Sequence, residues 1–469
     1  MTKILLITVG GSHQPIITAV RSLQPDRVVF VCSDGSKGST SQIIGTSNPC
    51  EFRQTETLKM PSEVEAFILE QLGIKNRYQS GRDSLNLMRV EKLPNIVTQI
   101  GLEDRFRADR DLILIQEPDD LSECYLKVSS FIQSIQQELP DAQIMADYTG
   151  GTKSMSVGLA MAALDNQVSV YVTAAVRTNI VKIERGELTG QASVAPVIAQ
   201  RTIEQFLPTF LQQYNYSAAI AQLRRLLSSM ILPSETKRKI QTLYACCSGL
   251  DAWDRFDHRE ALELLEPQMS HTEIRQLALF LKRVINSRGQ IDEKFDSSSG
   301  TEGHGYEIVQ DLLNSAERRA TQERYDDAVG RLYRALELLA QIRLKKTYGI
   351  RTGDVDLQQL PESLRNEYEQ QRSPIKGVIQ LALRSSYELL SKLPDDPLGK
   401  VYQENSNKII NALKVRNNSL FAHGFQPINS SDYQKVSEVF VKFIQSAITS
   451  VIPQKMQVPP LQFPNTLEI

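Results

Sequence analysis

The fold of the first part of the chain is decided by one stretch, Gln143-Ile144-Met145-Ala146-Asp147-Tyr148-Thr149-Gly150-Gly151-Thr152-Lys153-Ser154. Its apolar beginning, Gln143 to Ala146, is typical of a buried strand, and the small-residue segment Ser156 to Leu164 that follows is typical of a helix. The loop between them holds two glycines, several hydroxyl side chains and one lysine. A strand that passes through a glycine loop into a helix is the repeating unit of a parallel α/β sheet.

The N-terminus has the same order of elements. Lys3 to Val9 is largely apolar and ends in Gly10-Gly11-Ser12, and Pro15 then opens an amphipathic segment that runs to Leu23. The N-terminal part of the chain is therefore predicted to form a parallel α/β sheet, and we assign no role to the polar stretch Lys75 to Arg110. The other predicted elements are strands at Arg27 to Cys32, Asp111 to Ile115, Val168 to Val176 and Asn179 to Glu184, and helices at Ser62 to Leu72 and Leu121 to Glu138.

The two glycine loops have the composition of a phosphate-binding site. Gly150 and Gly151 allow close backbone approach, Lys153 adds a cation, and a helix N-terminus follows. The spacing is not that of a P-loop, because Thr152 separates Gly151 from Lys153. The alternative is a tight strand-to-helix turn with a solvated lysine, but two such loops on one sheet favour a binding site.

The segment Thr8-Val9-Gly10-Gly11-Ser12, together with the stretch from Asp147 to Ser154, resembles the CARF domain of type III CRISPR-associated proteins over about residues 1–190. The resemblance implies a Rossmann-like dimer whose paired loops bind a ring of adenylates, a cyclic oligoadenylate such as cA4 or cA6. The ligand-binding residues that it implies here are Gly10, Gly11, Ser12, Thr149, Gly150, Gly151, Thr152, Lys153 and Ser154.

A second informative stretch lies near the C-terminus, Arg416-Asn417-Asn418-Ser419-Leu420-Phe421-Ala422-His423. RNA carries its own nucleophile, the 2′-hydroxyl, so cleavage needs proton transfer and charge stabilisation but no metal. An imidazole titrates near neutral pH and can move the proton, and a guanidinium can hold the phosphate oxygens. The pair Arg416 and His423 therefore suggests ribonuclease chemistry, against the alternative of a surface arginine and a helix-capping histidine.

The spacing of this pair raises a geometric question. On one continuous helix, seven residues return Arg416 and His423 to nearly the same face, about 10 Å apart. That distance is too long for one pair to hold a single phosphate. We expect either that the segment Asn417 to Ser419 breaks the helix or that a second copy of the chain supplies another pair.

An arginine, a polar residue and a histidine a short distance later, within a helical C-terminal domain, are similar to the motif of HEPN ribonucleases. The separation of six residues is at the long end of the family's usual four to six, and Asn417 matches the polar residue that commonly follows the arginine. The resemblance implies an obligate homodimer with one composite, metal-independent site, in which Arg416, Asn417 and His423 are the catalytic residues.

Beyond residue 200 the strand pattern gives way to apolar residues spaced by three and four. We predict an all-α middle domain at 200–295 and an all-α C-terminal helical bundle at 305–455, which includes a helix from Val401 to His423. The polar segment Asp296 to Gly305 is the predicted linker between them, with His304 as a linker histidine. The polar segment Thr347 to Pro374 has no assigned role.

The composition limits the classes of partner. The chain of 469 residues has a formal net charge of −2, with 41% hydrophobic and 23% charged residues, so any contact with nucleic acid is local. No apolar run reaches about 18 residues, so we expect no membrane contact and a cytoplasmic location. Five cysteines and five histidines form neither a CxxC motif nor a zinc pattern, and we expect no metal and no cofactor beyond the activator.

The two resemblances together imply an endoribonuclease of type III CRISPR antiviral defence, which binds cyclic oligoadenylate in its first domain and cleaves single-stranded RNA in its last. The product would carry a 2′,3′-cyclic phosphate. A non-catalytic, adenylate-sensing helical scaffold or regulator is the main alternative. Two other classes fit less well. A sensor fused to a DNA-binding domain would need a basic recognition helix, and a nucleotide-dependent oxidoreductase would need a GxGxxG loop, but this sequence shows neither. Whether the sensor degrades its own activator stays open, and so do the RNA sequence preference and the ring size.

Overall fold

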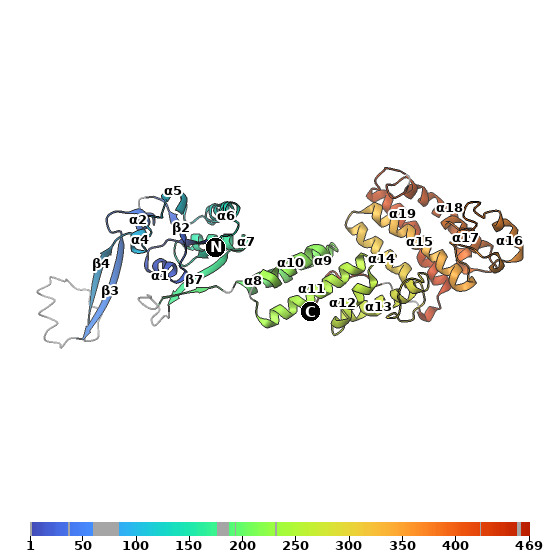
Figure 1. Cartoon of the computed structure of the whole chain (residues 1–469), viewed down its shortest axis with the longest axis horizontal. Helices are drawn as coiled ribbons and strands as arrows, with labels where there is room; N and C mark the ends of the chain where they lie inside the picture. Colours follow the sequence, from blue (N-terminus) through green and yellow to red (C-terminus); the bar gives the residue numbers. More distant parts are fainter. Residues whose placement is uncertain are drawn as a thin grey trace, which may run out of the picture. The chain divides into compact units, whose positions relative to one another are not determined.

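The computed structural model describes residues 2–35, 38–59, 84–175, 187–192, 194–229, 232–422, 424–456 and 461–469. The chain forms two compact units, Met1–Val194 and Ala195–Ile469 (Figure 1). The first unit contains the described β-sheets, and the second is built from helices. We describe each unit by itself.

The first unit contains a six-stranded sheet. In their order across the sheet, the strands are β5 (Leu112–Ile115), β2 (Arg27–Ser33), β1 (Lys3–Thr8), β6 (Gln143–Asp147), β7 (Ser169–Ala175) and β8 (Glu187–Gln191). The first five are parallel, and β8 pairs antiparallel with β7. This topology confirms the predicted Rossmann-like α/β fold. The strand predicted at Asn179 to Glu184 lies outside the described residues.

Helices cover both faces of this sheet, as the continuous apolar strands require. Along β1, Ile4 and Leu6 face one core and Leu5 and Ile7 face the other. The helices on the first face are α6 (Leu121–Glu138) and α7 (Lys153–Asp165), and those on the second are α1 (Gln14–Leu23) and α4 (Ile96–Gln99). A Cβ atom added to Gly158 would lie 2.7 Å from the Cβ of Cys124, so α6 and α7 pack closely only because this residue is glycine.

The polar stretch Lys75 to Arg110 contains regular structure where the structure describes it. An antiparallel hairpin joins β3 (Cys50–Lys59) to β4 (Ser84–Leu93), with a register from Cys50 opposite Leu93 to Lys59 opposite Ser84. No element was assigned in this stretch from the sequence, and β4 forms there because its backbone pairs with that of β3. The helix predicted at Ser62 to Leu72 lies outside the described residues. The remaining short helices of this unit are α2 (Ser41–Ile44) and α5 (Ala108–Asp111).

The second unit begins with helices where the all-α middle domain was predicted. Their bounds are α8 (Ala195–Arg201), the π-helix η1 (Thr202–Phe206), α9 (Leu207–Gln212), α10 (Tyr216–Ser229), α11 (Ser234–Asp254), α12 (His258–Leu265), the 3₁₀ helix η2 (Glu266–Gln268) and α13 (Thr272–Gly289). The C-terminal part contains α14 (Glu307–Thr321), α15 (Tyr325–Tyr348), η3 (Leu357–Gln359), α16 (Glu362–Glu369), α17 (Leu383–Lys392), α18 (Pro397–Asn417), α19 (Ser430–Val451) and η4 (Gln454–Met456). The prediction of a helical C-terminal region is confirmed.

One continuous core joins the middle helices to the C-terminal helices. The buried Asp311 of α14 accepts a hydrogen bond of 2.9 Å from Trp253 Nε1 on α11 and lies 3.1 Å from His258 Nε2 on α12. His304 lies in the connection between α13 and α14, as predicted for a linker histidine; it is buried, and its backbone N–H donates to Glu307 (2.7 Å). The division into domains at 200–295 and 305–455 stays a prediction.

Two properties of the described residues concern the class of protein. No described helix is long and apolar enough to cross a membrane. Each of the five cysteines is buried and carries a free thiol.

Candidate functional site

The two glycine loops of the sensor-like unit lie against each other. Because β1 and β6 are parallel neighbours, with Ile7 opposite Asp147, the loops that follow them leave the sheet at the same edge. A Cβ atom on Gly10 would lie 2.6 Å from the backbone nitrogen of Gly151, and one on Gly150 would lie 2.4 Å from the carbonyl oxygen of Thr8. These glycines are thus required for contact between the loops, whatever binds to them.

A buried carboxyl group, which the sequence analysis did not select, holds the second loop. Asp147 is fully buried and accepts hydrogen bonds from the backbone N–H of Thr149 and the hydroxyl of Thr173, both at 2.9 Å. The backbone N–H of Thr173 in turn donates to the hydroxyl of Thr149 (2.7 Å). Burial raises the pKa of Asp147, although the hydrogen bonds from Thr149 and Thr173 act against that rise.

Two of the predicted ligand hydroxyls already donate to main-chain carbonyls. Thr152 is the N-cap of α7, where its side-chain oxygen accepts from Met155 N (3.2 Å) and its hydroxyl donates to the carbonyl of Pro118. The Ser154 hydroxyl donates to the carbonyl of Asp119 (2.8 Å). These bonds tie the start of α7 to the loop after β5, and a ligand role for the two hydroxyls stays a prediction.

Lys153, Gly11 and Ser12 are exposed at the same edge of the sheet. Lys153 is the first residue of α7 and makes no ion pair with any residue that the structure describes. No heavy atom lies within 4 Å of a Cβ atom built on Gly11. A cation, a helix N-terminus and an open backbone segment therefore face solvent together, which is an arrangement suited to an anion.

The ribonuclease-like motif lies where α18 ends. The helix stops at Asn417, so the predicted helix from Val401 to His423 extends too far. The first of the two expected alternatives, a break at Asn417 to Ser419, is present. Ser419 N then donates to Arg416 O (3.0 Å). His423 itself lies outside the described residues. The residues on either side of it, Ala422 and Gly424, both donate backbone N–H groups to the carbonyl of Ser419 (3.1 and 3.2 Å).

Arg416 is half-buried and lies against an aromatic ring that sequence reasoning did not identify. Its guanidinium carbon is 4.1 Å from the ring centroid of Tyr333 on α15, which is a cation–π contact. Its Nη1 and Nη2 atoms make long hydrogen bonds of 3.4 Å with Asn417 Oδ1 and Phe421 O. Its Nε atom is buried without a hydrogen-bond partner among the described residues.

Large apolar side chains surround this motif on the surface. Leu420 is 62% exposed, Phe421 57% and Phe425 91%. Exposed apolar groups of this size in one short loop are typical of an interaction surface. Among the residues that the structure describes, no three His, Cys, Asp or Glu side chains form a group that could hold a metal ion.

Residues 299–447 match the family described as the Csm6 HEPN domain. No curated protein matches the chain.

The solved structures that match the chain include two with bound cyclic adenylates. The first is Csm6 of Enterococcus italicus bound to cyclic hexa-2′-fluoro-hexa-dAMP, with 12% sequence identity and a TM-score of 0.53 over 97% of this chain and 96% of that chain. The second is Can2 from Sulfobacillus thermosulfidooxidans in complex with cyclic tetra-adenylate, with 11% identity and a TM-score of 0.19 over 57% of this chain and 68% of that chain. The chain therefore shares the fold of the Enterococcus italicus Csm6 structure over nearly its whole length.

Proposed function

We propose that this chain is an RNA endonuclease switched on by cyclic oligoadenylate, because residues 299–447 match the family described as the Csm6 HEPN domain and nearly the whole chain shares the fold of a solved Csm6 structure. The observation that carries the proposal is the position of Arg416, held over Tyr333 where α18 ends, inside the matched segment.

The chemistry follows from the side chains of the motif. The RNA 2′-hydroxyl attacks the adjacent phosphorus, His423 takes or delivers the proton, and Arg416 stabilises the charge that develops on the phosphate oxygens. Asn417 is exposed beside Arg416 and positions its guanidinium. The products are a 2′,3′-cyclic phosphate and a 5′-hydroxyl, and no metal takes part in the step.

The switch is the pair of glycine loops in the first unit. Csm6 of Enterococcus italicus was solved with a cyclic hexa-adenylate analogue and Can2 with cyclic tetra-adenylate, and we propose a ligand of this class for the present chain. The backbone of Gly10 and Gly11, the α7 N-terminus and Lys153 supply the donors for its phosphates. The other residues that we propose to contact the cyclic oligoadenylate are Ser12, Thr149, Gly150, Gly151, Thr152 and Ser154.

The proposed active form is a homodimer. A ring of adenylates has rotational symmetry, so two copies of the loops can hold it across a two-fold axis. The exposed Leu420, Phe421 and Phe425 beside Arg416 give the catalytic motif an apolar rim that a second copy can cover. Light scattering without ligand should give twice the chain mass, and a dilute monomer that still cleaves RNA would contradict the composite site.

A cleavage assay tests the proposal. Fluorogenic single-stranded RNA is incubated with the protein in EDTA, with cyclic tetra-adenylate and cyclic hexa-adenylate supplied separately. We expect one ring size to switch on cleavage, DNA of the same sequence to survive, and Arg416→Ala or His423→Ala to abolish the signal. RNA that stays intact with both activators would support the alternative, a non-catalytic adenylate-sensing regulator, and cleavage that needs added magnesium or manganese would contradict the metal-independent mechanism.

A further inference from the structure

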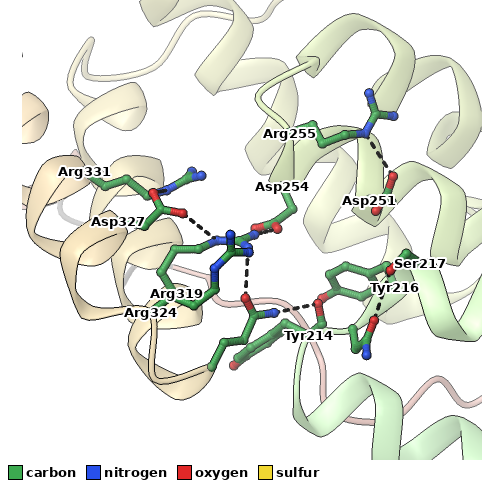
Figure 2. Close-up of a pocket in the computed structure, with 12 residues that line it drawn as sticks. Tyr214, Tyr216, Ser217, Asp251, Asp254, Arg255, Arg319, Arg324, Asp327 and Arg331 are labelled. Atoms are coloured by element: carbon green, nitrogen blue, oxygen red, sulfur yellow. Dashed lines mark hydrogen bonds and ion pairs between the residues drawn. The ribbon is translucent and has the colours of Figure 1, made fainter. Parts of the chain in front are cut away.

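The second unit contains a cavity remote in sequence from the Arg416 motif. Its volume is about 370 Å³, and it lies between the connection of α9 to α10, the end of α11, and the hairpin of α14 and α15 (Figure 2). Tyr214 to Ser217 form one wall. The end of α11 contributes Asp251, Asp254 and Arg255, and the hairpin contributes Arg319, Gln322, Arg324, Asp327 and Arg331. A volume of this size is in the range of small-ligand sites and suits a mononucleotide.

The hairpin side of the cavity has more guanidinium groups than carboxylates. Asp254 receives ion pairs from both Arg318 (2.8 Å) and Arg319. Asp327 receives one from Arg331 (2.9 Å) and lies 3.9 Å from Arg319 Nε. Two carboxylates thus form the ion pairs of three arginines, the buried Asp311 also attracts Arg318, and Arg324 adds a fourth positive charge.

The donors of this cluster are not all satisfied. Arg318 Nη2 and Arg319 Nε are buried without a hydrogen-bond partner among the described residues. Such orphaned charged donors are costly unless a further acceptor is present. Burial lowers the pKa of Arg319, and repulsion from Arg331 and Arg324 lowers it further, while attraction to Asp327 acts against that fall.

Arg324 gives the cavity an available cation. It is exposed at the start of α15, and its guanidinium makes no ion pair with any residue that the structure describes. Figure 2 shows Arg324 and Arg319 side by side at the hairpin wall, with Asp254 beside them. A planar guanidinium binds two phosphate oxygens at once.

We propose that this cavity binds a phosphate monoester of nucleotide size, either a free mononucleotide or the phosphorylated end of an RNA strand. Arg324 contacts the phosphate, and the positive charge of the Arg318, Arg319 and Arg331 cluster stabilises it. Asn215 and Ser217 on the facing wall offer hydrogen-bonding groups to the sugar. The site does not depend on the nuclease proposed above.

The test uses the full-length chain carrying Lys153→Ala and Arg416→Ala, so that neither of the other two anion sites contributes. Binding of AMP, adenosine and inorganic phosphate is measured by calorimetry, together with a short RNA bearing a 5′-phosphate and the same RNA with a 5′-hydroxyl. We expect AMP to bind and adenosine not to bind. Binding of the 5′-phosphorylated RNA but not of its 5′-hydroxyl form assigns the site to RNA ends, and binding of AMP alone assigns it to free nucleotides.

The matched variants are Arg324→Ala and Arg334→Ala, two exposed arginines on or beside α15 of which only the first lines the cavity. Arg324→Ala should weaken AMP binding about tenfold or more, Arg324→Glu should abolish it, and Arg334→Ala should leave it unchanged. Thermal unfolding of the unliganded variants shows that each is folded. Absence of AMP binding, or equal binding by the Arg324→Ala and Arg334→Ala proteins, overturns the proposal.

Discussion

At the scale of single residues, the contact between Arg416 and Tyr333 is the most direct support for a poised guanidinium. The guanidinium carbon of Arg416 lies 4.1 Å from the centroid of the Tyr333 ring, and its hydrogen bonds are long. The ring contact therefore helps to hold the guanidinium in place. A cation–π contact contributes about 0.5–2 kcal/mol, depending on desolvation. In the proposed mechanism Tyr333 is a positioning residue, because it contacts Arg416 and would act on the reaction through it.

We expect Tyr333→Leu to lower the rate of RNA cleavage at saturating activator by about 2- to 30-fold, since the guanidinium loses its aromatic support. Tyr333→Phe keeps the ring and should retain most of the rate. The concentration of cyclic oligoadenylate at half-activation should be the same in both variants. Single-turnover kinetics measure the effect, and a Tyr333→Leu protein that cleaves at the wild-type rate would show that the contact has no positioning role.

Asp147 gives a residue-scale prediction about pH. Burial raises its pKa in the folded chain, so proton binding favours the folded state: this contribution is fully present below the unfolded pKa and is lost as pH rises through the folded pKa. In the Asp147→Asn variant the side chain does not titrate, so this pH-dependent contribution to stability is absent. The Tm of the wild type minus that of Asp147→Asn should therefore become more negative from pH 4 to pH 7. A difference that is constant with pH would mean that Asp147 titrates alike in both states.

At the scale of elements, the loops after β1 and β6 are held together by backbone contact. Gly150→Ala would place a Cβ atom 2.4 Å from the Thr8 carbonyl oxygen, a main-chain atom that cannot rotate away. We expect a destabilisation of about 1–3 kcal/mol and a Tm lower by several degrees. Gly11→Ala is the matched control, because its Cβ atom meets nothing within 4 Å. Equal Tm values for the two variants would mean that the loops do not pack as described.

At the scale of the whole molecule, sensing and cleavage should separate. Lys153→Ala should raise the activator concentration at half-activation by roughly one to two decades, because a charged hydrogen bond is worth about 1.5–3 kcal/mol, and saturating activator should restore most of the rate. His423→Ala should abolish cleavage and keep the affinity for cyclic oligoadenylate. Titration of both variants by cleavage and by binding measures this. If Lys153→Ala changes neither quantity, the sensor site is not at Thr149 to Ser154.

The sequence by itself determined the elements that depend on local pattern. Largely apolar runs predicted β1, β2 and β6, the sequence pattern predicted the helix Leu121–Glu138, and short motifs led to both glycine loops and to Arg416. Each of these signals lies within a short stretch of sequence. The element can therefore be predicted without knowing which other strand or helix it packs against. The end of α18 at Asn417 was open between two readings, since the helical pattern continues past it.

Only the tertiary structure decided which of these elements meet. Periodicity is the same for every order of strands, so the pairing of β1 with β6, and with it the contact of the two loops, could not be read from the sequence. The contact of Tyr333 with Arg416 joins residues on different helices, and the buried Asp147 is locally an ordinary strand-end residue. The arginine cavity likewise exists because α11 packs against the hairpin of α14 and α15. Such contacts depend on long-range packing, for which a local stretch of sequence carries no signal.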